Sequence, residues 1–392
     1  MPMRIAMVAG EASGDQLGAH LIEALKRHLP EAEFYGIGGP KMVSAGFDAL
    51  FPAEALAVRG YVEVLRHYRG IARIRRELRR RLVRDKPAAF IGIDAPDFNL
   101  GLEGKLKARG IPAIHYVSPS IWAWRAGRID KIAQSVTHML ALFPFEPRIY
   151  EEKGVPVTYV GHPLADVFPL EVNVAAARER VGIPLTQPAF AILPGSRQSE
   201  LQYMAELLIE TVRLLSQRFP DAVFLVPFAT RETRNHFVSE MYRLKAGDLP
   251  MKLLFGHAHD AMAASNGVLV ASGTATLEAA LLKKPMVIAY RMAAGSYRLM
   301  RRMGYLPYVG LPNILAGRFV VPEFIQDDAT PQNLAQAFAN LVTDPGVCER
   351  LTEIFTEMHH VLRQNTAEKA AMAIIPYLTP TRSWAPTRSQ MA

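Results

Sequence analysis

Two aspartates stand where an apolar segment gives way to a loop, a position that suits chemistry on a bound ligand. Residues 88–93 read as a buried strand, and Asp94 follows at once, with Asp97 shortly after it. Ligands of open α/β sheets bind beyond the carboxyl ends of the strands. Asp94 could therefore act as a general base, with an inert loop aspartate as the alternative. Asp97 precedes a helical segment and could simply cap it.

A second candidate group follows the strand expected at residues 190–193. The tight turn that comes next contains Ser196 and Arg197 beside Gly195. An arginine held at a strand end offers a planar fork of N–H donors that matches a phosphate. The turn is therefore a candidate phosphate-binding site. A surface arginine without a ligand would give the same pattern and is the alternative.

The segment from Val268 to Arg291 combines a strand, a loop of small residues and the start of a helix. Unpaired N–H groups and the positive end of the helix dipole meet at such a start, which favours a diphosphate. Glu278 lies one turn into this helix, where its carboxylate could bind ribose hydroxyls. An ordinary β-α-β crossover with an exposed glutamate is the alternative. The residues expected to face a nucleotide are Ser272, Gly273, Thr274, Ala275 and Thr276.

The N-terminal segment opens like a doubly wound α/β domain but lacks the dinucleotide fingerprint. Residues 4–9 read as a strand, and a loop then leads into a helix that runs to residue 29. Glycines stand at positions 10, 14 and 18, so the G-x-G-x-x-G spacing is absent. NAD binding loses its main support, and we expect no cofactor.

Two tryptophans, Trp122 and Trp124, stand beside Arg125 after the strand expected at residues 113–117. Aromatic and guanidinium faces suit a sugar ring or the mouth of an acyl groove, and core packing under a loop is equally consistent with the pattern.

Residues 61–85 read as a helix with an apolar side and an arginine-rich side. The net charge of +8 fits an anionic partner, which could be nucleic acid, phospholipid or a phosphorylated substrate. The helix could be an interfacial surface for anionic lipid or an ordinary amphipathic helix with a solvated basic face. Nucleic-acid recognition is not expected, because no recognition module appears and aromatics do not interleave with the arginines.

Length and composition indicate a globular protein of two domains. Of the 392 residues, 50% are hydrophobic and 21% are charged. The alternation of strands and helices restarts after a looser stretch, so we expect an N-terminal domain at 1–165 and a C-terminal domain at 166–365. A terminal helix at 366–378 and a disordered tail at 379–392 complete the chain.

The expected location is the cytoplasm. A single cysteine, Cys348, argues against a disulfide framework and for a reducing compartment. Neither a signal peptide nor an uncharged apolar run of about 18 residues is present, so the protein is expected to be soluble or at most peripheral to a membrane.

His257 and His259 have no matching cysteines or carboxylates, so no metal site is expected. A homodimer is plausible, although no residue pattern identifies an oligomeric state.

Seven short motifs follow one another along both halves of the chain. They are AGEASGD at 9–15, GIDAPDFN at 92–99, HYVSPSIWAWR at 115–125, PGSR at 194–197, SGTATLE at 272–278, YRM at 290–292 and LPN at 311–313. In this order they closely resemble the lipid-A-disaccharide synthase family of lipopolysaccharide biosynthesis. The resemblance extends from Arg4 to about Tyr377 and leaves out only the tail.

This resemblance implies a GT-B fold, in which two Rossmann-like, doubly wound α/β domains face a cleft. It implies an inverting, metal-independent hexosyltransferase that joins UDP-2,3-diacylglucosamine to 2,3-diacylglucosamine 1-phosphate through a β-1,6 bond and releases UDP. Both substrates are amphiphiles. The resemblance therefore implies peripheral contact with the anionic inner membrane, at its cytoplasmic face.

Matching the candidate groups to this reaction assigns each of them a role. Asp94 takes the proton of the acceptor hydroxyl, and Asp97 caps or orients. Arg197, Asn313 and the N–H groups from Ser272 to Thr276 stabilise the departing UDP, with Ser196 beside them and Glu278 on the ribose. The acceptor side is expected to include Glu11, Ser13, Trp122 and Arg125.

Two other functions fit part of the pattern. A GT-B transferase or epimerase acting on soluble UDP-N-acetylglucosamine would use the same UDP cradle without needing acyl chains. A non-catalytic UDP- or lipid-binding protein would bind the nucleotide and consume no donor.

Overall fold

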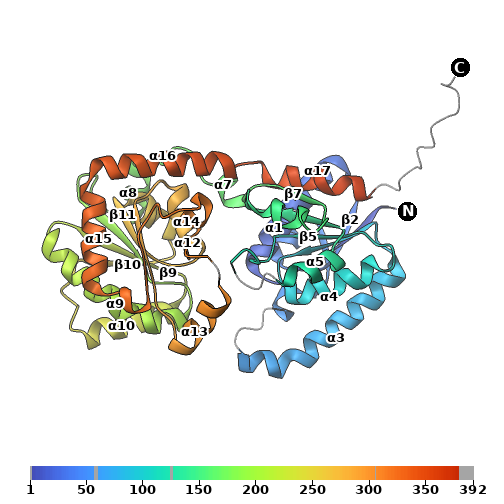
Figure 1. Cartoon of the computed structure of the whole chain (residues 1–392), viewed down its shortest axis with the longest axis horizontal. Coiled ribbons are helices and arrows are strands. Elements are labelled where there is room, and N and C mark those ends of the chain that lie inside the picture. Colours follow the sequence, from blue (N-terminus) through green and yellow to red (C-terminus); the bar gives the residue numbers. More distant parts are fainter. Residues whose placement is uncertain (1, 57–60, 124–126, 305, 379–392) are drawn as a thin grey trace, which may run out of the picture. The chain divides into compact units, whose positions relative to one another are not determined.

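The chain forms two compact units, each built on its own sheet (Figure 1). The computed structural model describes residues 2–56, 61–123, 127–304 and 306–378. Unit 1 contains the chain up to Pro163 together with the segment from Arg363 onward, and unit 2 runs from Leu164 to Leu362. The tail predicted at 379–392 lies outside the described residues.

Unit 1 is organised around a seven-stranded parallel sheet with the strand order β3-β2-β1-β4-β5-β6-β7. Its short apolar strands are buried because helices cover both faces, as in other doubly wound sheets. The strands are β1 (Arg4–Ala9), β2 (Glu33–Gly38), β3 (Phe47–Pro52), β4 (Ala89–Ile93), β5 (Ala113–Tyr116), β6 (His138–Ala141) and β7 (Val157–Tyr159). The helices are α1 (Ala12–His28), α2 (Pro40–Ser44), α3 (Tyr61–Asp85), α4 (Pro96–Lys107), α5 (Arg128–Ser135), α6 (Glu146–Glu151) and α17 (Thr366–Leu378), with a 3-10 turn at Ala53–Ala55.

Unit 2 repeats this plan with a six-stranded parallel sheet in the order β10-β9-β8-β11-β12-β13. Its strands are β8 (Ala189–Leu193), β9 (Val223–Phe228), β10 (Met251–Phe255), β11 (Gly267–Ala271), β12 (Met286–Tyr290) and β13 (Glu323–Ile325). Its helices are α7 (Pro163–Val167), α8 (Val174–Val181), α9 (Gln198–Arg218), α10 (Arg231–Arg243), α11 (Ala258–Ala264), α12 (Thr274–Leu281), α13 (Ala294–Met303), α14 (Leu311–Ala316), α15 (Pro331–Thr343) and α16 (Pro345–Leu362), with a 3-10 turn at Gln326–Asp328.

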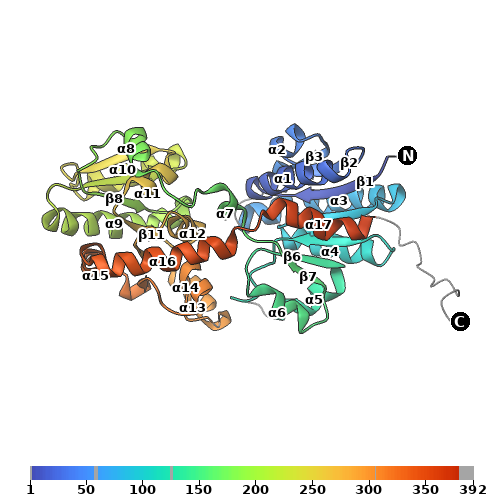
Figure 2. The same ribbon diagram turned by 90° about the horizontal axis from the view of Figure 1, so that it is seen from above.

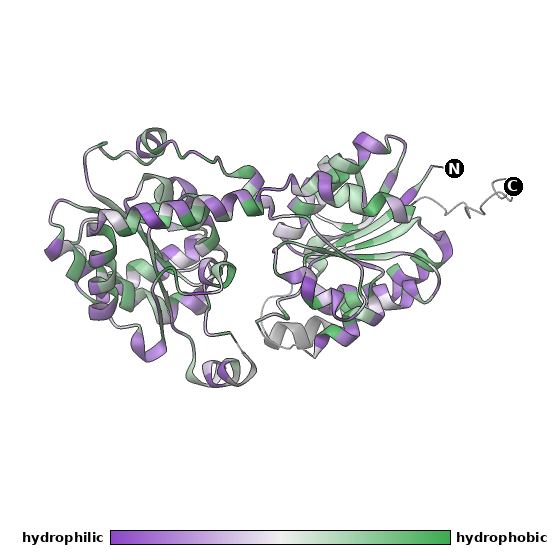
Figure 3. Cartoon of the chain, turned by 45° about the horizontal axis from the view of Figure 1, so that its top comes forward, coloured by the Kyte–Doolittle hydropathy of each residue, from purple (hydrophilic) through white to green (hydrophobic). Residues whose placement is uncertain are grey.

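Alternate residues of each central strand of unit 1 enter separate cores on the two faces of the sheet. Ile5 and Met7 pack with α1 and α17, whereas Ala6 and Val8 pack with the side chains of α3 and α4. This alternation follows from the two-residue period of a strand. Figure 3 shows the sheet strands of unit 1 in green and the purple, hydrophilic faces of the helices around them.

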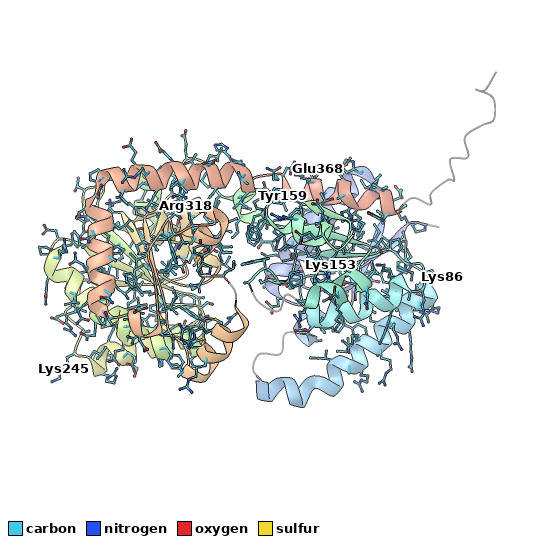
Figure 4. All side chains as sticks on the ribbon, viewed as in Figure 1. Lys86, Lys153, Tyr159, Lys245, Arg318 and Glu368 are labelled. Carbon is cyan, nitrogen blue, oxygen red and sulfur yellow. The ribbon has the colours of Figure 1, made fainter. Side chains whose placement is uncertain are left out.

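The last helix, α17, packs on the first sheet, although its residues follow the whole of unit 2 in the sequence. It lies beside α1 in the view of Figure 2, and Ala370, Ala371 and Ile374 enter the same core as the α1 side chains. Glu368, labelled in Figure 4, pairs with His28 and with Arg27 at 2.6 Å. The two ends of the described chain therefore belong to one folding unit.

The predicted class of two doubly wound α/β domains is confirmed. The arginine-rich helix spans the predicted residues 61–85, and the terminal helix spans 366–378. The sequence pattern missed β3, because most of its side chains are not buried and no continuous apolar run marks it. Among the described helices, none combines the length and the apolar character needed to cross a membrane.

Candidate active site

Both groups of predicted site residues lie at a topological switch point, where the strand order of a sheet reverses. In unit 1, β1 and β4 are neighbours, and Ala9 pairs with Ile93 at their carboxyl ends. In unit 2, β8 and β11 are neighbours, and Leu193 pairs with Val270. Loops that leave adjacent strand ends in opposite directions open a crevice, which is where doubly wound sheets bind ligands.

Asp94 lies in a left-handed turn at the end of β4. Its φ is 50°, and the φ of Ala95 is 43°, a region that non-glycine residues rarely adopt. Asp94 N–H donates to Tyr116 O at 2.8 Å, and Asn99 Nδ2 donates to Asp94 O at 2.8 Å. Both interactions use the backbone of Asp94, so the turn is held in place while its half-buried carboxylate is left for other contacts.

A buried glutamate–histidine pair lies on α4 and β5, next to the strand that ends in this turn. Glu103 on α4 and His115 on β5 are each fully buried, with Oε1 and Nδ1 2.7 Å apart. Burial raises the pKa of Glu103. Burial lowers the pKa of His115, but Glu103 and Asp94 together raise it above its ordinary value. Gly92 makes room for the pair, since a Cβ there would overlap Glu103 Oε1. Sequence reasoning missed both residues, although His115 begins one of the most specific motifs.

Asp97 is tied to a neighbouring helix. Its carboxylate is 82% exposed and pairs with Arg128 of α5. Arg75 of α3 donates to the backbone carbonyl of Asp97 at 3.4 Å. Ala95 occupies the N-cap position of α4, so Asp97 lies within the first turn, where its charge favours the helix dipole.

The loop after β1 lies against the Asp94 turn. An ideal Cβ on Gly10 would lie 3.4 Å from the Cβ of Ala95. Glu11 is the N-cap residue of α1 without a side-chain cap hydrogen bond, and both Glu11 and Ser13 are exposed. The loop that leads to these two acceptor-side candidates therefore lies against the turn that carries the candidate base. Asp15, in the same motif, is used internally, because its carboxylate accepts N–H groups at the start of α2.

Trp122 is anchored by a buried glutamate that the sequence did not indicate. Trp122 Nε1 donates to Glu146 Oε1 at 3.0 Å, and the other carboxylate oxygen accepts the N–H groups of Leu142 and Phe143. Burial raises the pKa of Glu146 to about 7. Trp122 contacts Phe143 and Phe145 edge to face and remains partly exposed. It is therefore neither a fully buried core residue nor a side chain without contacts at the surface. Arg125, the remaining acceptor-side candidate, lies outside the described residues.

In unit 2, the turn after β8 presents the Arg197 side chain to solvent. Gly195 has a φ of 108°, and Glu200 accepts the N–H groups of Ser196 and Arg197 at 3.1 and 3.2 Å. The Arg197 side chain is 78% exposed, and its Nη1 lies 3.5 Å from Glu200 Oε1. The Glu200 carboxylate thus fixes the backbone of the turn while most of the guanidinium remains accessible.

The loop after β11 leaves the start of α12 open. Gly273 is the N-cap residue with a φ of 147°, and no heavy atom lies within 4 Å of an ideal Cβ there. Ser272 Oγ donates to Val309 O, and Thr276 Oγ1 donates to Gly273 O, so both hydroxyls shape the loop. The N–H groups at the start of the helix are therefore the groups in this segment that remain suited to an anion.

Glu278 contacts a histidine from a different helix. His259 Nε2 lies 3.4 Å from Glu278 Oε2, and the His259 ring packs edge to face on Phe168. The hydrogen bond that His259 donates to Glu278 is the largest cause of the raised pKa of His259. Only 19% of the Glu278 side chain is exposed. His259 is thus a partner of Glu278, the residue predicted to bind the ribose.

Asn313 is fully buried, and its amide is used completely within unit 2. Its Nδ2 donates to Val321 O and to Glu323 Oε1, and its Oδ1 accepts the N–H groups of Val320 and Val321. An amide offers two donors and one oxygen with two lone pairs, so none is left for a phosphate in this geometry. The sequence predicted a direct phosphate contact for Asn313. In this geometry Asn313 positions the backbone together with Glu323, which also accepts the N–H groups of Val309 and Gly310.

The comparison with protein families gives one decisive match. The model of the lipid-A-disaccharide synthetase family matches residues 5–374, which is nearly the whole chain. The chain belongs to the lipid-A-disaccharide synthase family. A lipid-A-disaccharide synthase from Azoarcus sp. is 62% identical over 386 residues, covering 98% of this chain and 99% of that protein. One from Dechloromonas aromatica is 62% identical over 377 residues, covering 96% and 99%.

Solved structures support the GT-B fold for this member of the family. A co-structure of S. aureus MnaA with UDP has a TM-score of 0.63 at 14% identity and covers 96% of both chains. The UDP-GlcNAc 2-epimerase of Neisseria meningitidis bound to UDP-GlcNAc has a TM-score of 0.61 at 14% identity and covers 96% of this chain and 99% of its own. MurG of Acinetobacter baumannii has a TM-score of 0.56 at 14% identity, with coverage of 96% and 100%. At these identities the likeness establishes the fold alone.

Within this synthase-family chain, the sequence-predicted residues fall into two local groups. Asp94, Asp97, Glu11 and Ser13 come together around β1 and β4, with Trp122 on the loop after β5. Ser196 and Arg197 follow β8, and residues 272–278 follow β11. In the described parts of the chain, no cluster of three or more His, Cys, Asp and Glu side chains could hold a metal ion.

Proposed function

We propose that the chain is an inverting glycosyltransferase that transfers 2,3-diacylglucosamine from UDP to 2,3-diacylglucosamine 1-phosphate. The products are a β-1,6-linked lipid A disaccharide 1-phosphate and UDP. The observation that carries the proposal is the pair of switch points in a member of this family. One supports an accessible carboxylate and the other an open helix start beside an exposed arginine.

Asp94 is the proposed general base. The acceptor 6-hydroxyl attacks the anomeric carbon while its proton passes to the Asp94 carboxylate, and the bond from that carbon to the UDP oxygen breaks with inversion. Proton transfer to a positioned carboxylate contributes roughly 10²–10⁴ in rate. The support for this role is a strained turn fixed through its backbone, with the carboxylate left half-buried and unfixed. Asp97, paired with Arg128, orients the start of α4.

The departing UDP is the proposed ligand of the unit 2 switch point. The Arg197 guanidinium and the N–H groups at the start of α12 stabilise the charge that develops on the diphosphate. Glu278 binds the ribose hydroxyls. Loss of one such preorganised donor costs about 10²–10³ in rate. Asn313 and Glu323 contribute by holding the backbone at Val309 and Gly310 beside this loop.

The acceptor side of the proposal includes Glu11, Ser13 and the Trp122 ring. The aromatic group around Trp122 follows β5 and β6, whose carboxyl ends lie on the same edge of the sheet as the end of β4. A partly exposed ring held by Glu146 offers a rigid apolar face to a sugar or to the first part of an acyl chain.

We also propose that α3 brings the protein to an anionic bilayer at the cytoplasmic face of the inner membrane. A surface hollow of about 140 Å³ between α3 and α4 has the apolar residues Gly101 and Leu102 in its wall. Its cationic side chains are Arg75, Arg76, Arg79 and Lys105. Among the described residues, none of these four pairs with a carboxylate, and Arg75 donates only to the backbone carbonyl of Asp97, so their charges are available to an external anion.

A single reconstitution tests the proposed function. Purified protein is incubated with UDP-2,3-diacylglucosamine and 2,3-diacylglucosamine 1-phosphate, and UDP and the disaccharide are followed by mass spectrometry. We expect both products to appear together, also in the presence of EDTA. Turnover of UDP-N-acetylglucosamine without acyl chains would support a soluble-substrate enzyme instead. UDP binding without donor consumption would support a binding protein, and a requirement for added Mg²⁺ would contradict the metal-free mechanism. Light scattering on the same sample measures whether the chain forms the expected homodimer.

A further inference from the structure

We propose that His259 is a positioning residue for the donor nucleotide, which holds the Glu278 carboxylate in the orientation that binds the ribose hydroxyls of UDP. The inference rests on the proposed function, because it gives His259 a role through the ribose contact of Glu278. His259 itself does not touch the nucleotide in this account. It acts on the carboxylate from α11, a different helix of the same unit.

The two side chains come from helices that precede and follow one strand. α11 leads into β11, α12 leaves it, and the two helices contact each other. His259 lies in the first turn of α11, and Glu278 lies in the second turn of α12. His259 Nε2 is 3.4 Å from Glu278 Oε2. This contact involves one carboxylate oxygen, so Oε1 is left for a ribose hydroxyl.

Further contacts fix the start of α11. Asp260 Oδ1 accepts a hydrogen bond from Arg180 Nε at 2.7 Å, and Asp260 Oδ2 lies 3.0 Å from His257 Nδ1. The His259 ring packs edge to face on the buried Phe168, with the ring centroids 4.8 Å apart. The position of the His259 ring is therefore set by α11 and by Phe168 before any ligand binds.

The orientation of Glu278 before binding matters because a glutamate side chain has three rotatable bonds. A ligand that must immobilise such a side chain binds about two- to tenfold more weakly. A partner that already holds the carboxylate removes this loss. The hydrogen bond to Glu278 raises the pKa of His259, burial lowers it, and the charges of Glu278 and Asp260 raise it further. These charges favour the imidazolium form, which pairs most strongly with a carboxylate.

A purely structural role explains the contact less well. The His259 side chain is 57% exposed, and ion pairs near the surface contribute little to folding stability. Glu278 lies on the helix whose first turn is proposed to bind the diphosphate. The ribose is joined directly to that diphosphate, which would place it within about one helical turn of the carboxylate. An ordered carboxylate at this position therefore serves ligand binding more than it serves the fold.

The experiment measures recognition of the ribose without catalysis. The affinities of UDP and 2′-deoxy-UDP are measured by isothermal titration calorimetry, and their ratio reports the contact with the 2′-hydroxyl. We expect the unaltered protein to favour UDP by about tenfold or more, because this hydroxyl donates to a charged group. Glu278→Ala should bring the ratio close to one. His259→Phe keeps a ring against Phe168 but has no N–H donor, and it should lower the ratio about two- to tenfold.

Two further variants separate positioning from structure. His259→Gln restores an amide donor near the position of Nε2 and should recover part of the ratio. His360→Phe makes the same change as His259→Phe at an exposed position of α16 in unit 2, and its ratio should equal that of the unaltered protein. Thermal midpoints of all variants show whether a change in the ratio accompanies a loss of folding.

The double variant Glu278→Ala with His259→Phe tests whether His259 acts only through the carboxylate. We expect it to bind UDP as Glu278→Ala alone does, because the second change then removes nothing more. Weaker UDP binding by the double variant, at an equal thermal midpoint, would indicate that His259 contacts the nucleotide directly and would overturn the proposal.

The outcomes separate this inference from the proposed function. If the unaltered protein does not favour UDP, or if Glu278→Ala keeps the preference, Glu278 does not bind the ribose. That part of the proposed function then fails together with the role of His259. If Glu278→Ala loses the preference while His259→Phe keeps it, the ribose contact stands and the role of His259 is refuted.

Discussion

Asn313 Nδ2 donates to Glu323 Oε1 at 2.8 Å, and this link joins the start of α14 to β13 at the edge of the second sheet. The same carboxylate accepts the backbone N–H groups of Val309 and Gly310. Asn313 and Glu323 therefore form the centre of a buried polar network that shapes the backbone beside the proposed UDP site. The interaction replaces the phosphate contact that the sequence had suggested for Asn313.

Asn313→Ala should destabilise unit 2. It leaves the N–H groups of Val320 and Val321 and the carbonyl of Val321 without their partner, each at about 1–3 kcal/mol. We expect the thermal midpoint to fall by at least about 6 °C, measured by calorimetry. Asn340→Ala, at an exposed position of α15, is the control and should change little. An unchanged midpoint combined with lost turnover would instead indicate a direct contact between Asn313 and the substrate.

Asp94→Asn should reduce turnover at least a hundredfold by the general-base estimate, because the amide cannot accept the hydroxyl proton. UDP affinity, measured by isothermal titration calorimetry, should stay the same, since the residues proposed to bind UDP belong to unit 2. Asp97→Asn should cost less, about tenfold or below, because that carboxylate is 82% exposed and bound to Arg128. Near-normal turnover of Asp94→Asn would remove Asp94 from the mechanism.

Glu278→Gln should lower the pKa of His259 measured by NMR. The hydrogen bond that His259 donates to Glu278 is the largest cause that raises this pKa, and burial opposes it. The stabilisation by the charged pair is therefore fully present below the unfolded pKa of histidine and is lost as the pH rises through the raised folded value. Asp260→Asn should lower the pKa by a smaller amount, since Asp260 acts only through space. Equal titration of His259 with and without Glu278 would show that the two side chains are not coupled in solution.

Glu146→Gln should remove a pH dependence of stability. Burial raises the pKa of Glu146 to about 7, so folding favours the protonated carboxyl. Its contribution is most favourable below about 4.5 and declines by about 3 kcal/mol as the pH rises from 4.5 to 7. Thermal midpoints over this interval, compared between the variant and the unaltered protein, isolate this one group. Identical pH dependence in the two proteins would contradict the raised pKa.

Replacing Arg76, Arg79 and Arg80 by serine should weaken binding to vesicles that contain anionic phospholipid. Each basic side chain near such a surface is worth about 1 kcal/mol, so the triple variant should bind about a hundredfold more weakly at low salt. Added salt should weaken the binding of the unaltered protein to these vesicles by a similar factor. The control removes three exposed cations from unit 2, Arg231, Arg234 and Lys245, and should bind like the unaltered protein. Equal weakening in both variants would indicate a net-charge effect without a dedicated surface.

The sequence by itself determined most of the elements, though not β3, and the strand ends that carry the candidate groups. Its short apolar runs and helical periods place Asp94 after β4, Arg197 after β8 and Ser272 after β11. These predictions succeed because burial and periodicity are local properties of the chain. The motifs around the same residues indicate the family, because each combines the end of a strand with a loop of particular residues.

Only the tertiary structure decided which strand ends are neighbours and which polar groups are already in use. β1 lies beside β4, and β8 beside β11, through pairings that no local pattern encodes. The contacts of Glu103 with His115, Glu278 with His259 and Glu146 with Trp122 each join different elements. The full use of the Asn313 amide depends on Val320 and Val321 in the loop before β13 and on Glu323 at its start. The physical reason is that burial and hydrogen-bond partners are set by packing across the sheet. A residue can look like a ligand in the sequence and serve as structure in the fold.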